Sequence, residues 1–442
     1  MDDSLATPIT RSAFTASTGP ETPGDRVLSR WRTVMHRPAA LTTRLPGWFL
    51  HLLAGTVLIQ LAVYAARPAV TYKALELAAQ PWELGLIASS FAALSLVMAI
   101  PAGRWVDRIG ETPVIALGAA LVAAACVGIA LMRHAWAVAV AHALLGFGHL
   151  LNTVALQTML ANRSEPGAHG ARVGSYTVAV SVGQLVGPAL AGWLMAHAGG
   201  TWAVFAVSAT IGLVTALQWC GDPGMHRRRG GTAPAQAGDA VTRPAKGTPV
   251  REDPVRAGVL DVLRSPGVAA AMLTSLAVLS SIDVLVAYLP VWGEERGFPV
   301  TFVALLLSVR GAASLLSRLV MGWLTRTVPM HTLLAGSALA AAAALAAMPW
   351  VGWPLALVGL MAVAGLGLGL GQPLTMAWVA SRAPRHIRGL ALGLRLSGNR
   401  LGQLLVPALV GMVLHLAGID AIFWSVATLL LLGGLVALRT PF

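Results

Sequence analysis

The sequence has 442 residues, of which 56% are hydrophobic and only 11% are charged. A water-soluble chain of this length could not cover such a composition with polar surface, so the composition excludes a soluble protein and indicates a membrane protein. The formal net charge of +13 would suggest nucleic acid as a partner of a soluble chain. The placement of the charges along the chain argues against that partner.

The first 46 residues are polar and combine arginine with proline, serine and threonine. They contain no short apolar core followed by a small-residue cleavage site, which a signal peptide would need. We therefore expect residues 1–46 to form a disordered cytoplasmic tail.

Apolar stretches of about 20 residues, the length that crosses a hydrocarbon layer roughly 30 Å thick, recur along the chain. They predict twelve transmembrane helices, at 47–68, 83–104, 113–132, 135–160, 173–197, 201–221, 267–291, 301–324, 331–350, 353–380, 390–416 and 421–439. Between the sixth and seventh, residues 222–266 mix basic residues with Gly, Pro and Ala, as expected of a flexible cytoplasmic linker. The predicted domains are an amino-terminal six-helix bundle over 47–221 and a carboxy-terminal bundle over 267–442.

Most lysines and arginines fall in the tails and cytoplasmic loops if the amino terminus is cytoplasmic. The external loops then keep four, Arg67, Lys73, Arg133 and Arg296. By the positive-inside rule both termini are cytoplasmic. No basic surface that would suit nucleic acid is left.

A shift of 219 residues lays the second half of the chain on the first. Gly146 then aligns with Gly365 and Gly148 with Gly367, and the clearest block aligns residues 183–192 with 402–411. Because each half has an even number of predicted helices, the repeat is parallel about an axis normal to the membrane. Such symmetry predicts two bundles that move around a site at their interface.

The segment between the second and third predicted helices reads GRWVDRIG, from Gly103 to Gly110. With Asp107 and Arg108 in place, it resembles the G-x-x-x-D-R-x-G signature of the major facilitator superfamily, and the resemblance covers residues 47–439. It implies an all-α membrane protein with twelve helices in two pseudo-symmetric six-helix bundles. In that family the aspartate is thought to meet the start of helix 11 and nearby arginines, and so to hold the cytoplasmic side closed. A role in topology alone is the alternative for Asp107.

The fifth predicted helix carries small residues and a proline at spacings that resemble the motif of the family's drug/proton antiporters. The residues are Gly174, Gly183, Gly187, Pro188, Ala191 and Gly192, with the alanine replacing one glycine. The resemblance favours export by exchange. Close helix packing alone is the alternative, because small side chains let membrane helices approach each other.

The fourth predicted helix carries two histidines. Related antiporters keep an arginine four residues before a glycine, and here His142 stands at that position before Gly146. His142 is therefore a candidate for proton coupling, with interhelical hydrogen bonding as the alternative. His149 lies seven residues further on the same face and is a candidate for binding substrate.

Apart from Glu83 at the first residue of the second span, Asp283 is the only acid within any predicted span, and Arg310 lies at nearly the same depth on the next helix. A charge near the bilayer centre needs a partner or a cavity, so the two could simply pair. Alternatively, Asp283 exchanges a proton while Arg310 holds the carboxylate ionised until it moves away. Arg400 then lacks a carboxylate, which makes it a candidate for binding an anionic group of the substrate; helix carbonyls or water are the alternative partners.

Helices 1, 4, 7 and 10 line the transport path in the family that the sequence resembles. Gln60, Tyr64 and Arg67 share one face of the first predicted helix, with Arg67 at the external mouth. Gln372 follows a glycine-rich stretch of the tenth. We expect these residues to bind substrate together with Asp283 and Arg310.

The sequence has no phosphate-binding glycine loop with its lysine and no His/Cys cluster with metal-ligand spacing. We therefore expect no cofactor, no metal and no enzymatic activity. The leading hypothesis is a monomeric secondary transporter in a bacterial cytoplasmic membrane. It would export a small organic compound, with an anion as one candidate class, in exchange for protons. The alternatives are proton-coupled import of an organic anion and a non-transporting membrane receptor or scaffold.

Overall fold

The computed structural model describes residues 46–165, 167–221, 262, 267–383 and 388–440. The expected tail, residues 1–46, and the expected linker, residues 222–266, therefore lie outside the described residues except for Pro46 and Val262. The chain divides into two compact units, Met1–Leu50 and His51–Phe442. Of the first unit the structure describes residues 46–50, which begin the first described helix. The second unit contains all the other described residues.

The described residues form twelve helices long and apolar enough to cross a membrane, and no strand. They are α2(Gly47–Glu76), α3(Pro81–Ile109), α4(Glu111–Leu131), α5(Ala135–Arg163), α6(His169–His197), α7(Thr201–Cys220), α9(Val268–Glu295), α10(Val300–Thr327), α11(Met330–Ala347), which continues into the 3-10 turn η2(Met348–Trp350), α12(Pro354–Arg382), α13(Arg388–Ala417) and α14(Ala421–Arg439). The predicted all-α fold with twelve spans is confirmed.

Helix α2 differs most from its prediction. It continues to Glu76 instead of ending at residue 68, so Lys73 lies in a helix and not in an external loop, and Arg67 lies nine residues before the helix end. Pro68 suggested a helix end, but prolines are tolerated inside transmembrane helices because neighbouring helices satisfy the freed backbone groups. The placement of Arg67 at an external mouth was therefore wrong.

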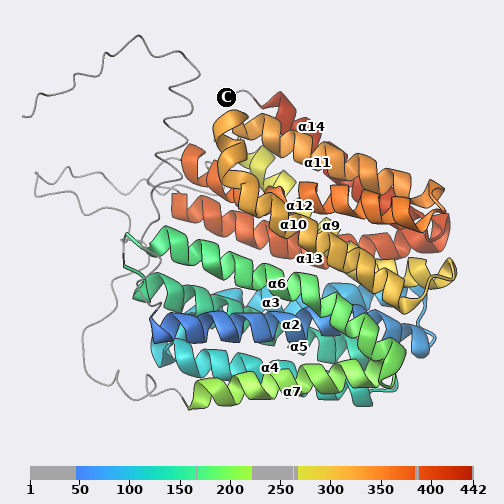
Figure 1. Cartoon of the computed structure of the whole chain (residues 1–442), viewed down its shortest axis with the longest axis horizontal. Coiled ribbons are helices and arrows are strands. Elements are labelled where there is room, and N and C mark those ends of the chain that lie inside the picture. Colours follow the sequence, from blue (N-terminus) through green and yellow to red (C-terminus); the bar gives the residue numbers. More distant parts are fainter. Residues whose placement is uncertain (1–45, 166, 222–261, 263–266, 384–387, 441–442) are drawn as a thin grey trace, which may run out of the picture. The chain divides into compact units, whose positions relative to one another are not determined.

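Helix packing groups the elements in chain order (Figure 1). Helix α4 packs against α5 and α7, and α3 packs against α5; in the second half α12 packs against α10 and α11, and α9 packs against α13 and α14. The two groups meet through two extensive contacts, α3 with α13 and α6 with α10.

The sequence repeat reappears in the packing of equivalent glycines. A methyl group added to Gly146 would collide with the backbone of Phe91, and one added to Gly365 would collide with the backbone of Arg310, the residue 219 positions after Phe91. Gly148 packs in the same way on Gly118, and Gly367 on Ser337, again 219 positions later. The two halves are thus pseudo-symmetric at the level of individual contacts.

The halves touch closely at the end of the bundle where α3 begins and α6 ends. A methyl group on Gly85 of α3 would lie 3.1 Å from the Pro407 carbonyl oxygen of α13, and one on Gly192 of α6 would collide with Ala304 of α10. Near the opposite end, methyl groups on Gly103 and Gly322 would meet nothing within 4 Å. The described contacts between the halves therefore favour one end of the bundle.

Candidate functional site

Asp283 of α9 is buried in the middle of the protein and is held by both of its oxygens. Its Oδ1 accepts a 2.7 Å hydrogen bond from the guanidinium of Arg67 on α2, and its Oδ2 accepts a hydrogen bond from the amide of Gln403 on α13. The expected pairing of Asp283 with Arg310 was therefore wrong. Because α2 continues past Pro68, Arg67 is carried into the interior, where it takes the position beside the carboxylate.

Arg67 is bound on its other sides by aromatic rings. Its guanidinium carbon lies 4.4 Å from the ring centre of Phe91 and 5.9 Å from that of Tyr64. A guanidinium over an aromatic face is attracted by the ring quadrupole. Arg67 thus joins the two halves of the chain through an ion pair of which both side chains are more than nine-tenths buried.

Gln403 extends the network to a second arginine. Its Oε1 accepts a 3.1 Å hydrogen bond from Nη1 of Arg400, so Arg67, Asp283, Gln403 and Arg400 form one connected chain of polar groups. The sequence left Arg400 without a carboxylate, and the structure gives it an amide oxygen of its own helix. A role of Arg400 in binding an anionic group stays a prediction. The amide of Gln403 lies between the guanidinium of Arg400 and the carboxylate of Asp283.

The same arrangement occurs in the first half with different chemistry. Gln184 of α6, the repeat equivalent of Gln403, donates a 3.0 Å hydrogen bond to the hydroxyl of Tyr64, which is the equivalent of Asp283. Each pair is separated by 120 residues along the chain. One half therefore places a neutral phenol where the other places a carboxylate.

A polar pocket of about 220 Å³ adjoins this network. It is lined by residues of α2, α5 and α6, namely Gln60, Tyr64, His149, Thr153, Gln157, Tyr176, Thr177 and Val180. The Gln60 side-chain oxygen lies 3.2 Å from His149 Nε2, which fits a donated hydrogen bond. The lining extends from the middle of α2 toward the end where α5 ends and α6 begins, away from the close contacts between the halves. The structure thus brings three predicted substrate-binding residues, Gln60, Tyr64 and His149, to one cavity.

Arg310 of α10 is fully buried, and none of its three guanidinium nitrogens has a hydrogen-bond partner in the described part of the chain. It interacts electrostatically with Tyr64, Arg318, Arg67 and Asp283. The structure therefore brings Arg310 to the same region as Tyr64 without giving it a bonded counter-ion.

His142 and Gln372 are engaged elsewhere. His142 Nδ1 lies 2.8 Å from the Ile87 carbonyl oxygen of α3, as in an interhelical hydrogen bond, and its Nε2 has no partner among the described residues. The amide of Gln372 donates to the Ser275 carbonyl oxygen, and its own oxygen accepts from Arg395 at 2.9 Å. Roles for these two residues in coupling and binding stay predictions.

The glycines of the predicted antiporter motif bring α6 against α2. Methyl groups on Gly183 and Gly187 would meet the backbone of Gln60 and Tyr64, the two pocket residues, and Pro188 lies within the same helix. Gly192 approaches Ala304 of α10. These positions therefore fix how α6 sits against both α2 and the second half of the chain.

Residues of the predicted cytoplasmic signature lie at the end of α3. Asp107 and Arg108 are exposed, and Gly110 follows the helix with a φ of 90°, in the region that favours glycine. Residues 384–387, which precede α13, lie outside the described residues, so the expected latch between Asp107 and that helix start stays a prediction.

Sequence reasoning missed the roles of Gln184 and Gln403. Both stand in the repeated Gly-Gln-Leu block, which was noticed for its glycines. A polar side chain repeated at equivalent positions of two membrane helices was the signal that could have identified them.

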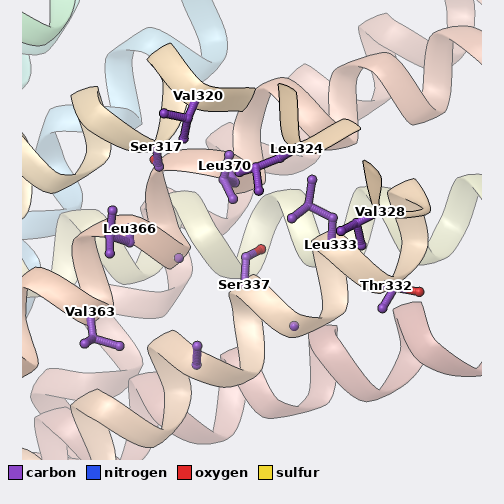
Figure 2. Close-up of a pocket in the computed structure, with 13 residues that line it drawn as sticks. Ser317, Val320, Leu324, Val328, Thr332, Leu333, Ser337, Val363, Leu366 and Leu370 are labelled. Carbon is purple, nitrogen blue, oxygen red and sulfur yellow. The ribbon is translucent and has the colours of Figure 1, made fainter. Parts of the chain in front are cut away.

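A second cavity, of about 360 Å³, lies between α10, α11 and α12 (Figure 2). Its lining is apolar except for hydroxyl groups, and Ser317 and Ser337 donate theirs to carbonyl oxygens of their own helices. Several lining side chains, including Val320 and Leu366, are exposed on the outside of the bundle. This cavity offers no charged group to a polar solute, so the candidate site is the network around Asp283.

Comparison with known proteins fits this architecture. Family models match the Major Facilitator Superfamily at residues 52–354 and 329–441. The chain therefore belongs to that superfamily and is a multi-pass membrane transporter.

Two solved structures show the same fold. One is a bacterial homolog of the human lysosomal transporter Spinster, in an inward-facing and occupied conformation, with 16% identity, a TM-score of 0.68, and coverage of 90% of this chain and 98% of that one. The other is a D-xylose-proton symporter, with 16% identity, a TM-score of 0.70, and coverage of 89% and 97%. The comparison with curated proteins found no match.

Proposed function

We propose that this protein is a secondary active transporter that exports a small organic compound in exchange for protons by alternating access. Asp283 is the proton carrier in this proposal. The observation that carries it is the buried ion pair between Asp283 and Arg67, which ties α9 of one half to α2 of the other. An ion pair at this position links the protonation of one carboxylate to the relative position of the halves.

The linkage follows from the electrostatics of a buried pair. While Asp283 is ionised, it stabilises Arg67 and holds α2 against α9; a proton on Asp283 removes that attraction and leaves Arg67 without its counter-charge. Separation of the helices then becomes easier, and water can reach Arg67. Each separation of α2 from α9 is thereby tied to binding of a proton by Asp283. Each return of the two helices is tied to release of that proton.

The proton motive force supplies enough free energy to drive this transport. One elementary charge that crosses a potential of 100 mV releases about 2.3 kcal/mol. We place the protein in a bacterial cytoplasmic membrane with both termini in the cytoplasm, because most basic residues then face that side. In this orientation the closely packed end of the bundle is external, and the pocket at Tyr64 extends toward the cytoplasm.

Export is supported by the motif of α6, whose glycines lie against the pocket residues of α2. Uptake of an organic anion is the second candidate, and it is supported by Arg310, whose guanidinium nitrogens have no hydrogen-bond partner among the described residues. Flux in inverted and right-side-out vesicles under the same imposed pH gradient separates the two directions.

The test uses the purified protein in liposomes with an imposed pH gradient. Radiolabelled organic acids and drugs that stabilise the protein against heat would serve as solutes. We expect flux to follow the gradient in the wild type and to stop following it in Asp283→Asn. Asp420→Asn is the matched control, since Asp420 pairs with Arg296 at 2.9 Å but is about one-third exposed. Gradient-driven flux in Asp283→Asn at the wild-type rate would refute the proposal.

A further inference from the structure

Arg310 differs from four other arginines of the described helices, Arg67, Arg318, Arg395 and Arg400. Arg318 donates to Ser181 Oγ at 2.9 Å and to the Gly369 carbonyl oxygen, and Arg395 donates to the side chains of Gln372 and Thr375 at 2.9 Å. Arg67 and Arg400 belong to the network around Asp283. Arg310 alone among these five is fully buried with all three nitrogens unbonded within the described residues. Burial of such a charge is expensive unless something pairs with it.

The repeat does not keep a charge at this position. In the first half the equivalent residue is Phe91, and its backbone packs on Gly146 as the backbone of Arg310 packs on Gly365. The same backbone contact therefore carries an apolar side chain in one half and an arginine in the other. The arginine calls for another explanation.

The surroundings of Arg310 show what is missing. The acid within its electrostatic reach, Asp283, is already bonded to Arg67 and Gln403. Gly311, the next residue of α10, packs on the backbone of Gln184, and the Gln184 amide donates a 3.0 Å hydrogen bond to the Tyr64 hydroxyl. This packing brings the Arg310 segment of α10 to the residues that hold Tyr64, and Tyr64 lines the 220 Å³ pocket.

We propose that Arg310 binds an oxyanion of the transported solute, a carboxylate, sulfonate or phosphate group that enters through the pocket at Tyr64. This inference rests on the proposed transport function and names the class of its substrate. A guanidinium is planar and presents paired N–H groups, which match the two oxygens of such a group. Arg67 keeps its own partner, so anion binding and proton coupling use different arginines.

The first experiment needs no solute. Arg310→Met keeps the size of the side chain and removes its charge, and Arg310→Phe reproduces the residue of the first half. We expect either variant to raise the apparent melting temperature of the purified protein by about 3 °C or more, because a costly unpaired charge is gone. Arg395→Met, which deletes an arginine with several hydrogen bonds, should lower it. A melting temperature that falls or does not change in both Arg310 variants would show that the guanidinium stabilises the fold, and would overturn the proposal.

The second experiment measures protection against heat by benzoate, benzenesulfonate and inorganic phosphate, with neutral benzamide as control. At least one anion should stabilise the wild type and Arg310→Lys, whereas none should stabilise Arg310→Met and benzamide should stabilise neither. Protection that persists in Arg310→Met, or wild type protected by none of the three anions, would overturn the oxyanion site.

Binding measured in detergent requires no gradient, so its result separates this inference from the proposed function. Loss of gradient-driven transport is tested in Asp283→Asn, and loss of anion protection is tested in Arg310→Met. Loss of coupling in Asp283→Asn together with anion protection that survives in Arg310→Met would sink the oxyanion site alone. Gradient-driven transport that persists in Asp283→Asn, together with loss of anion protection in Arg310→Met, would contradict only the coupling role of Asp283.

Discussion

The two halves of this transporter share one scaffold and differ at the residues that carry charge. Gln184 bonds the Tyr64 hydroxyl in the first half, and Gln403 bonds the Asp283 carboxylate in the second. The equivalent glycines pack alike in both, but the residue that they meet is Phe91 in one half and Arg310 in the other. At these equivalent positions the first half packs without a charge, while it contributes Arg67 to the ion pair with Asp283. We infer that the charges of Asp283 and Arg310 serve function rather than packing.

The largest expected effect comes from breaking the ion pair between the halves. Arg67→Met leaves the buried Asp283 carboxylate without its counter-charge and should cost about 3–5 kcal/mol of stability. The double variant Arg67→Met/Asp283→Leu should recover most of this loss, because it leaves no unpaired charge. Thermal unfolding in detergent of the wild type, Arg67→Met, Asp283→Leu and the double variant measures the coupling free energy between the two side chains. Additive losses in the double variant would contradict the pairing.

A smaller effect distinguishes the two equivalent glutamines. Gln403→Leu removes hydrogen bonds to two charged groups, Asp283 and Arg400, and about 1.5–3 kcal/mol is typical of each, whereas Gln184→Leu removes one to a phenol, for which about 0.5–1.5 kcal/mol is typical. Denaturation of both variants under the same conditions tests the order. Equal losses of stability would contradict the stronger hydrogen bonding of Gln403.

The scaffold itself should respond equally in both halves. Gly146→Ala and Gly365→Ala each press a methyl group into the backbone of a neighbouring helix and should each cost about 1–3 kcal/mol. Gly322→Ala is the matched control, since its added methyl group would meet nothing within 4 Å. If thermal unfolding shows a large loss of stability in only one of the variants Gly146→Ala and Gly365→Ala, the pseudo-symmetry does not extend to packing energy.

The smallest effect is expected at the surface ion pair of Arg296 and Asp420. Both side chains are about one-third exposed, so solvent screens their attraction, and Asp420→Asn should cost about 0–1 kcal/mol. Its melting temperature should change little with salt. A loss as large as that of Arg67→Met would mean that burial does not distinguish the two pairs.

The fold could be predicted from the sequence because lipid imposes simple rules on length and polarity. Each apolar stretch became a helix, and the repeat predicted from Gly146 and Gly365 appears in their contacts. The site was harder to predict. Pro68 suggested a helix end, which placed Arg67 at the external mouth. Arg310 then remained as the predicted partner of Asp283. The partner of a buried charge depends on contacts between distant helices, and spacing along one helix does not determine them.

The most direct test of the central claim is gradient-driven solute flux in liposomes that contain wild type, Asp283→Asn or Asp420→Asn. We expect an imposed pH gradient to drive flux through the wild type and Asp420→Asn but not through Asp283→Asn. Gradient-driven flux through Asp283→Asn at the wild-type rate would show that the ion pair between Asp283 and Arg67 does not couple protons to transport.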